Sequence, residues 1–448
     1  MQSKQTQFLT LATLILVFTL SLSEQAASAD GQATSLPQYS AESHMGVATC
    51  ANSMCHGVRI LSEPSNVRQN EYHTWLFNDR HSKAYTTLLS DDSKRIAQKL
   101  GIADASTANI CLDCHADNVS QDKRGPEFHI SDGVGCEACH GGAENYIGTH
   151  TITPYDQERN LKDGMYPTGS ISSRTILCTS CHVGTSEKLA NHNIMGAGHP
   201  RLSFELDTFI ARQPVHYDVD QDYIERKGKG IQSTESPISR MLIGTALFAR
   251  ANAENLNSKL LDHPQGFPEI ALFNCHSCHK SLNSQSWEPR PRTSGLKPGS
   301  IRINDGSFIL LAALSGAIDK RLQNSILIAT KQLHKASLNS TQEVKTAARD
   351  LIQLTKQAEI TFSRLDISQE ISNLILKEIT QFGANGEYTD YIAAEQALMS
   401  MSAISQHFPG NVNLEDFINQ AYKLTGNDEK YQAGKMKRLM QEYLTTSY

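Results

Sequence analysis

Residues 136–140 read Cys136-Glu-Ala-Cys139-His140, a pair of cysteines followed at once by a histidine. Three other stretches repeat this Cys-x-x-Cys-His pattern, and one more is a stretched version with four residues between its cysteines. They are Cys111-Leu-Asp-Cys114-His115, Cys178-Thr-Ser-Cys181-His182, Cys275-His-Ser-Cys278-His279 and the stretched Cys50-Ala-Asn-Ser-Met-Cys55-His56. All ten cysteines of the chain fall into these five pairs.

This pattern is typical of covalent haem c attachment. Two thiols add to the haem vinyl groups, and the following histidine binds the iron from the proximal side. Neither a zinc site nor a redox dithiol explains why a histidine follows every second cysteine. We therefore expect five haems c, although a disulfide remains the alternative for Cys50 and Cys55. The expected proximal iron ligands are His56, His115, His140, His182 and His279.

The N-terminus predicts export. Lys4 precedes an uncharged, largely apolar stretch from Phe8 to Leu22, and Ala27-Ser28-Ala29 supplies the small residues of a cleavage site. This stretch is shorter than the roughly 20 apolar residues of a spanning helix. We expect a signal peptide at 1–29, a periplasmic or otherwise exported protein, and no stable membrane span after cleavage. Haem attachment to such motifs outside the cytoplasm agrees with this expectation.

The composition divides the 448 residues into two halves. The stretch 288–300 contains three prolines and two glycines and is predicted to be a linker. All cysteines precede it, in a segment with only short apolar runs, where packed haems would supply the buried apolar mass. The prediction is a mainly α protein, with a signal peptide at 1–29, a pentahaem domain of short helices and loops at 30–287, and an α-helical domain at 301–448.

Helical periodicity is clearest in the second half. Apolar residues recur at helical spacing from Ile371 through Leu374 and Ile375 to Phe382, and another apolar stripe begins at Phe308. About six helices are expected there. A capping box is predicted at 340–343, and helix stops at 383, 385–386 and 409–410. In the first half, clear helices are expected only at 91–100 and 239–256.

The second axial ligand of each iron should also be a histidine, because histidines are dense in the first half. Of 17 histidines, five are proximal, and His276, His334 and His407 are not expected to be ligands because they lie inside a motif or in the Cys-free half. The nine remaining candidates are His44, His73, His81, His129, His150, His192, His199, His216 and His263.

Several segments resemble the multihaem cytochromes of the cytochrome c-554 family, which is related to hydroxylamine oxidoreductase. They are the segment from Trp75 to His81-Ser-Lys-Ala-Tyr85, the stretch Asp132-Gly-Val-Gly-Cys136 with the glycines after His140, and the segment from Cys178 to His199-Pro-Arg-Leu-Ser-Phe-Glu-Leu206. The resemblance implies that His81 is an axial ligand and, by the same argument, that His150, His192 and His199 are distal ligands. His44, His73, His129 and His216 compete for the fifth place, and His263 is expected to be exposed.

Electron transfer is the favoured function, through mostly bis-His haems, with redox donor and acceptor proteins as partners. The alternative is a multihaem oxidoreductase that acts on small nitrogen or sulfur species at one open-site haem. A third hypothesis is an interaction role in which the C-terminal helices dock a partner or form a homo-oligomer. The net charge of −6 and the lack of a basic stripe give no support for nucleic-acid binding. The sequence indicates no catalytic residue.

Overall fold

The computed structural model describes residues 35–59, 69–152, 157–213, 236–262, 268–279, 292, 296–297 and 300–447. The predicted signal peptide, His216 and His263 lie outside these residues. The described part is mainly α, which confirms the predicted fold class. Within it, extended pairing is limited to two isolated bridges, His44 with Arg124 and Phe273 with Ile303.

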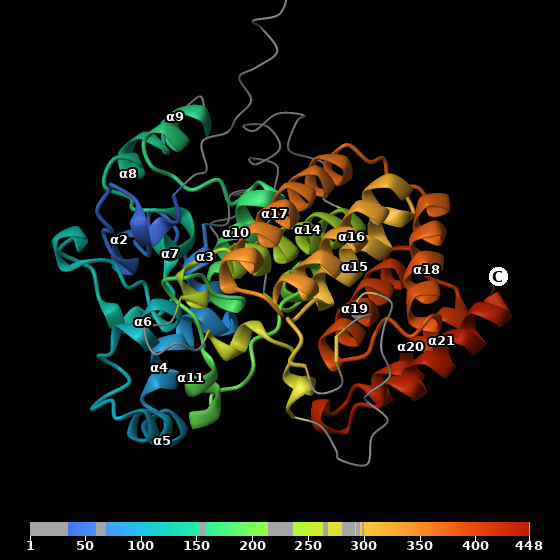
Figure 1. Cartoon of the computed structure of the whole chain (residues 1–448). Coiled ribbons are helices and arrows are strands. Elements are labelled where there is room, and N and C mark those ends of the chain that lie inside the picture. Colours follow the sequence, from blue (N-terminus) through green and yellow to red (C-terminus); the bar gives the residue numbers. More distant parts are fainter. Residues whose placement is uncertain are drawn as a thin grey trace, which may run out of the picture.

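The first half consists of short helices joined by loops and 3-10 turns (Figure 1). Its α-helices are α2 (Val47–Cys50), α3 (Glu71–Asn78), α4 (Ala84–Leu88), α5 (Asp91–Leu100), α6 (Asn109–His115), α7 (Cys136–His140), α8 (Tyr146–Thr149), α9 (Gln157–Lys162), α10 (Ile171–His182), α11 (His192–Ala197) and α12 (Leu206–Arg212). The helix predicted at 91–100 is α5. It begins at a Ser90 cap, whose side chain accepts from the Ser93 amide, and stops at Gly101 in the left-handed region.

The second half is a bundle of longer helices, on the opposite side of Figure 1 from α2 and α8. It contains seven α-helices in residues 300–447, against the six expected. They are α15 (Gly306–Gly316), α16 (Lys320–Ala336), α17 (Thr341–Ser363), α18 (Gln369–Ala384), α19 (Tyr391–His407), α20 (Val412–Leu424) and α21 (Ala433–Ser447).

Local capping signals in this half are largely confirmed. The Ser340 side chain accepts from the Glu343 amide at 3.2 Å, as an N-cap should. The Glu343 carboxylate instead accepts from Asn339, so only one half of the capping box forms. α18 continues through Gly383 and ends at Ala384, ahead of Gly386 with φ 82°.

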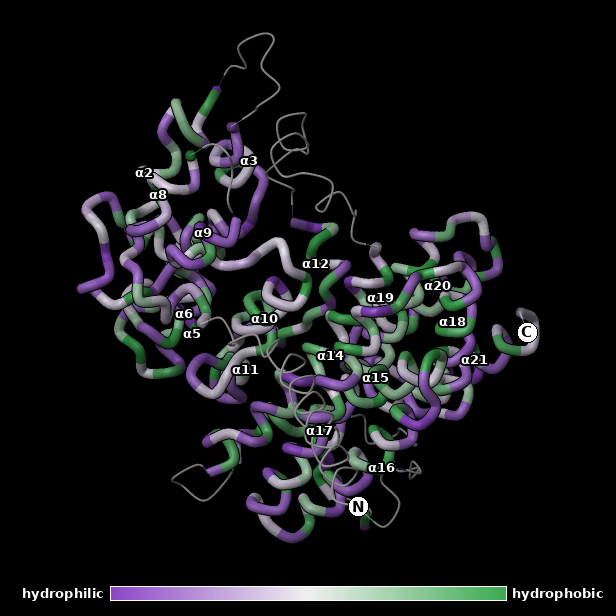
Figure 2. Tube along the Cα trace, turned by 90° about the horizontal axis from the view of Figure 1, so that it is seen from above, coloured by the Kyte–Doolittle hydropathy of each residue, from purple (hydrophilic) through white to green (hydrophobic). Residues whose placement is uncertain are grey.

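Helix α14 (Pro237–Leu256) belongs by packing to the C-terminal helices, although its residues precede the predicted linker. Its buried side chains, among them Met241 and Leu242, share one hydrophobic core with α15 to α21. Figure 2 shows hydrophobic residues along α14 and α15. The core that supports the second half therefore begins before residue 288. The sequence did not reveal this because the prolines and cysteines suggested a boundary farther along the chain.

The apolar stripes also differ in detail from the prediction. All 11 residues of α15 are buried, so neighbouring helices surround it instead of covering one face. On α18, Ile375 is fully buried, whereas Leu374 is 44 % exposed. Sequence spacing alone could not separate these adjacent positions.

Arg292 is the best-described residue of the predicted linker. Its guanidinium lies 5.2 Å from the centre of the Phe382 ring and pairs with Glu387, and the residue is buried. The division into domains stays a prediction, but at Arg292 the chain packs against the C-terminal helices. Among the described helices, none has the length and hydropathy needed to cross a bilayer.

Candidate haem-binding site

Four of the five proximal histidines face a second histidine from a distant part of the chain. Each pair combines one proximal histidine with one of the four histidines that the resemblance singled out. The pairs and their ring-centroid distances are His56 with His150 at 6.2 Å, His81 with His182 at 6.2 Å, His115 with His199 at 6.3 Å, and His192 with His279 at 6.3 Å.

These distances fit an iron between two imidazoles. A metal that binds imidazole nitrogens at about 2 Å on each side holds the two ring centroids roughly 6 Å apart. The donor set around each pair also fits haem c, because two cysteines precede each proximal histidine.

Hydrogen bonds to the ring nitrogens orient these histidines. His56 Nδ1 donates to Glu71 Oε2 at 3.0 Å, and His150 Nδ1 donates to the Tyr146 carbonyl at 2.9 Å. His81 Nδ1 donates to Asp79 Oδ1 at 2.9 Å. A proton held on Nδ1 leaves the lone pair on Nε2, which is the tautomer that binds a metal through Nε2.

The same arrangement recurs in a third pair. His115 Nδ1 donates to the Ala84 carbonyl at 3.0 Å, and His199 Nδ1 donates to the Pro200 carbonyl at 2.7 Å. Burial lowers the pKa of His115 and so favours its neutral form. Five of the eight paired histidines therefore have Nδ1 hydrogen-bonded to a carboxylate or carbonyl oxygen.

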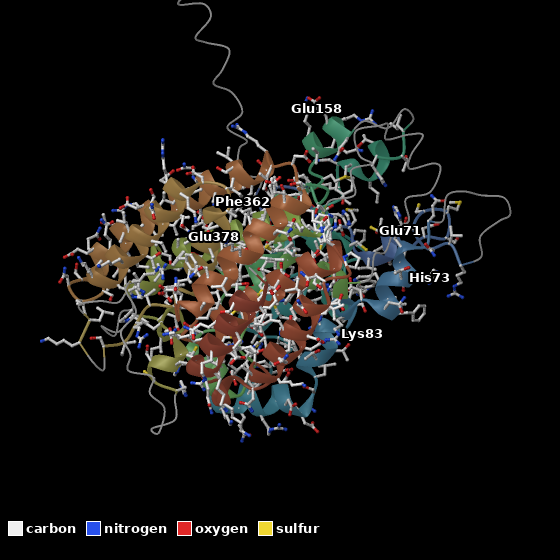
Figure 3. The ribbon with its side chains drawn as sticks, turned by 90° about the vertical axis from the view of Figure 1, so that its right-hand side faces the viewer. Glu71, His73, Lys83, Glu158, Phe362 and Glu378 are labelled. Atoms are coloured by element: carbon white, nitrogen blue, oxygen red, sulfur yellow. The ribbon has the colours of Figure 1, made fainter. Side chains whose placement is uncertain are left out.

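Two of the candidates for the fifth distal ligand, His44 and His73, have a backbone carbonyl as the hydrogen-bond partner of Nε2. His44 is fully buried, with Nδ1 at 2.7 Å from Asp117 Oδ2 and Nε2 at 3.2 Å from the Pro37 carbonyl. His73 Nε2 donates to the Gly57 carbonyl at 3.1 Å. Figure 3 shows His73 beside Glu71 on α3, far from Phe362 in the C-terminal helices. Carbonyl partners at Nε2 argue against iron binding by either residue in this arrangement.

Helical geometry explains why the short motifs work. In α6, Cys111, Cys114 and His115 occupy positions i, i+3 and i+4, which share one helix face. The motif of α7 and the end of α10 have the same geometry. One face therefore presents both thiols and the imidazole to a single porphyrin.

The stretched first motif closes by a loop. α2 ends at Cys50, and the His56 amide donates to the Cys50 carbonyl at 3.2 Å. The extra residues project outward, and Met54 is 81 % exposed. The backbone thus brings the two ends of this motif together despite its length.

The motifs themselves lie side by side. The Cys50 thiol hydrogen bonds with that of Cys136, and the Cys114 thiol with that of Cys181. Burial raises the pKa of the Cys178 thiol to about 12. Cys139 is also close enough to Cys178 for an electrostatic interaction. The spatial order is therefore first, third, fourth and second motif.

The fifth motif joins this row through α11 and through the second half of the chain. His192 begins α11 and faces His279, whereas His199 lies just beyond the helix and faces His115. The side chain of Asn274 donates to Asp390 Oδ2 at 2.9 Å in a buried contact. The C-terminal helices thus hold the fifth motif in place.

The remaining expected or candidate iron ligands are His140, His129 and His216. His140 ends α7, and its carbonyl accepts from the Tyr166 amide at 2.8 Å. His129 is exposed before a 3-10 turn. Since His216 lies outside the described residues, the structure gives no contact for it. In the described residues, no cluster of His, Cys, Asp or Glu side chains forms a separate metal site.

Residues 49–141 match the model of the family described as cytochrome c554 and c-prime. This part of the chain is similar to the c-type cytochromes of that family. The match covers the first three motifs and the segment around His81; the third motif and the His81 segment are among those that carried the resemblance. No curated protein and no solved structure matches the chain. The family match supports haem c as the cofactor, electron transfer as the role, and redox proteins as partners.

The groups that hydrogen bond to the paired histidines were not predicted from the sequence. Asp79, two residues before His81, is the clearest of these, and Glu71 is another. Acidic residues near an expected ligand are a usable signal, because histidines that bind metals commonly donate their other N–H to a carboxylate or carbonyl. Lys188 and Glu137, two buried charges at the motif contacts, gave no such signal.

Proposed function

We propose that the chain is an exported pentahaem c-type cytochrome that carries electrons between a redox donor protein and an acceptor protein. The observation that supports this most is the set of four histidine pairs at 6.2–6.3 Å. Each pair can fill both axial positions of one iron. A haem with two protein ligands exchanges electrons without binding substrate, since its iron supplies the redox change and the protein supplies position and electrostatics.

In this proposal each haem is held by its own cysteine pair and proximal histidine, with the distal histidine supplied from elsewhere. His150 serves the first motif, His199 the second, His81 the fourth and His192 the fifth. His140 is the proximal ligand of the third motif. The hydrogen bonds of His44 and His73 leave His129 and His216 as the candidates for its distal ligand.

Export also belongs to the proposal. The family match is to c-type cytochromes, which are typically exported, and residues 1–29 have the pattern of a signal peptide. Periplasmic or extracellular redox proteins would then be the partners. The C-terminal helices contribute by holding the fifth motif.

Two measurements on the purified protein test the proposal. Intact mass after acid extraction of free haem should correspond to five covalent haems and a start near Asp30. Reduced protein mixed with carbon monoxide, nitrite or hydroxylamine should show little spectral change, yet should exchange electrons quickly with redox mediators. Stoichiometric carbon monoxide binding with steady turnover of nitrite or hydroxylamine would instead favour an oxidoreductase.

A further inference from the structure

A buried lysine lies at the contact between the second and fourth motifs. Lys188 is only 7 % exposed, and its Nζ lies 3.4 Å from the Asp113 carbonyl and 3.4 Å from Cys181 Sγ. It also donates to the side chain of Gln38. Three neighbours that can accept match the three N–H groups of an ammonium, which has no acceptor of its own. A positive charge therefore lies where the thiols of Cys114 and Cys181 meet.

A buried carboxylate occupies the corresponding position at the other contact. Glu137 lies within the third motif and is 2 % exposed. Its Oε1 accepts from the Met45 and Ala143 amides at 2.7 and 2.8 Å, and its Oε2 accepts from the Gly46 amide at 2.7 Å. Burial raises the pKa of the Glu137 carboxyl, and the three amide hydrogen bonds act in the opposite direction by stabilising its ionised form.

The two charges act on different pairs of motifs. Lys188 Nζ lies 3.4 Å from Cys181 Sγ, and the Cys181 thiol hydrogen bonds with that of Cys114, so the positive charge is next to the fourth and second motifs. Glu137 directly follows Cys136, whose thiol hydrogen bonds with that of Cys50, so the negative charge is next to the third and first motifs. The two thiol contacts are thus similar in geometry and opposite in electrostatic sign.

We propose that Lys188 and Glu137 set a redox gradient along the row, with the irons of the second and fourth motifs easier to reduce than those of the first and third. This inference rests on the proposed function, since it requires haems at these motifs. Reduction adds one negative charge to a haem, which a nearby cation stabilises and a nearby anion disfavours, and low polarity strengthens both effects.

The gradient gives electron flow a direction. With haems bound, one electron would pass from a ferrous haem held at the first or third motif, which would become ferric, to a ferric haem held at the second or fourth motif, which would become ferrous. No bond forms or breaks and no proton moves. The donor protein supplies the electron at the first pair of motifs, and the acceptor protein removes it beyond the second pair.

Spectroelectrochemical titration of full-length Lys188→Met tests the inference, with Lys188→Arg as the control that keeps the charge. At a fixed potential, Lys188→Met should lower the ratio of reduced to oxidised haem by about tenfold at two irons, while Lys188→Arg changes it little. Glu137→Gln should raise the same ratio at two other irons. Irons are assigned from the paramagnetic resonance signals that disappear in His199→Ala and His81→Ala.

Haem count by mass separates the two possible failures. A wild-type protein without covalent haems would refute the proposed function itself. Five haems with unchanged potentials in Lys188→Met, or with equal shifts at all five irons, would overturn the gradient alone. If Lys188→Met loses haem, Lys188→Gln repeats the test with a polar side chain. The wild type gives a second check, because the irons perturbed by His199→Ala and His81→Ala should have higher potentials than those of the first and third motifs.

Discussion

His56 and His150 lie opposite each other, with ring centroids 6.2 Å apart and planes 14° from parallel, although His56 follows the first cysteine pair and His150 follows the third. The gap suits an iron, and the hydrogen bonds at both Nδ1 atoms direct the Nε2 atoms toward it. An iron there would join two segments that are distant in sequence. Haem binding and folding should therefore be coupled in this half of the chain.

Replacement of His81 by alanine should convert one low-spin haem to high spin, because His182 would lose its facing imidazole. The number of covalent haems should stay unchanged, since His81 belongs to no attachment motif. Visible and paramagnetic resonance spectra measure the change. His407→Ala, at the end of α19, is the control and should leave every haem low-spin; an unaltered spectrum in His81→Ala would rule this assignment out.

His192→Ala and His199→Ala should each open a different iron, because His192 faces His279 and His199 faces His115. The double variant should then show two high-spin haems, with the effects of the single variants adding. Integrated resonance intensity measures this. One high-spin haem in the double variant would mean that the two histidines share an iron.

The Cys50→Ser, Cys55→Ser double variant should lose one covalent haem and keep the rest. The loop that returns His56 to Cys50 makes the stretched motif an attachment site. Intact mass measures the count. An unchanged haem number would show that these cysteines form no haem linkage, and a disulfide between them would then be the expected alternative.

Two neighbouring residues of α18 should differ sharply in their effect on stability. Ile375→Ala should reduce the free energy of unfolding by about 2–5 kcal/mol, because a fully buried side chain leaves a cavity. Leu374→Ala, at a half-exposed position, should change it by only about 0.5 kcal/mol. Denaturant unfolding followed by far-ultraviolet circular dichroism gives both values. Equal losses would contradict the burial pattern of this helix.

The attachment cysteines and proximal histidines could be predicted from sequence because covalent chemistry fixes their order over five or seven residues. The distal histidines could be ranked only by resemblance, since they come from other segments. Their partners could not be predicted, because the tertiary fold decides that His150 faces His56 and not a closer motif. The hydrogen bonds that distinguish His81 from His44 likewise depend on folded contacts.

The helical fold was predictable from periodicity and caps, but its extent was not. The Ser340 cap and the stop at Gly386 are local signals, and both were found. The packing of α14 with α15 to α21 depends on contacts across the linker. Lys188 and Glu137 were missed for a similar reason, because a charged residue in sequence gives no sign that it will be buried.

Low-temperature paramagnetic resonance of the purified, oxidised protein tests the central claim most directly, because it reports the spin state of each ferric haem. The account predicts low-spin signals from at least four haems per chain, one for each of the four histidine pairs. High-spin signals that integrate to two or more haems per chain would contradict it, since at least one of these pairs would then fail to bind its iron on both sides.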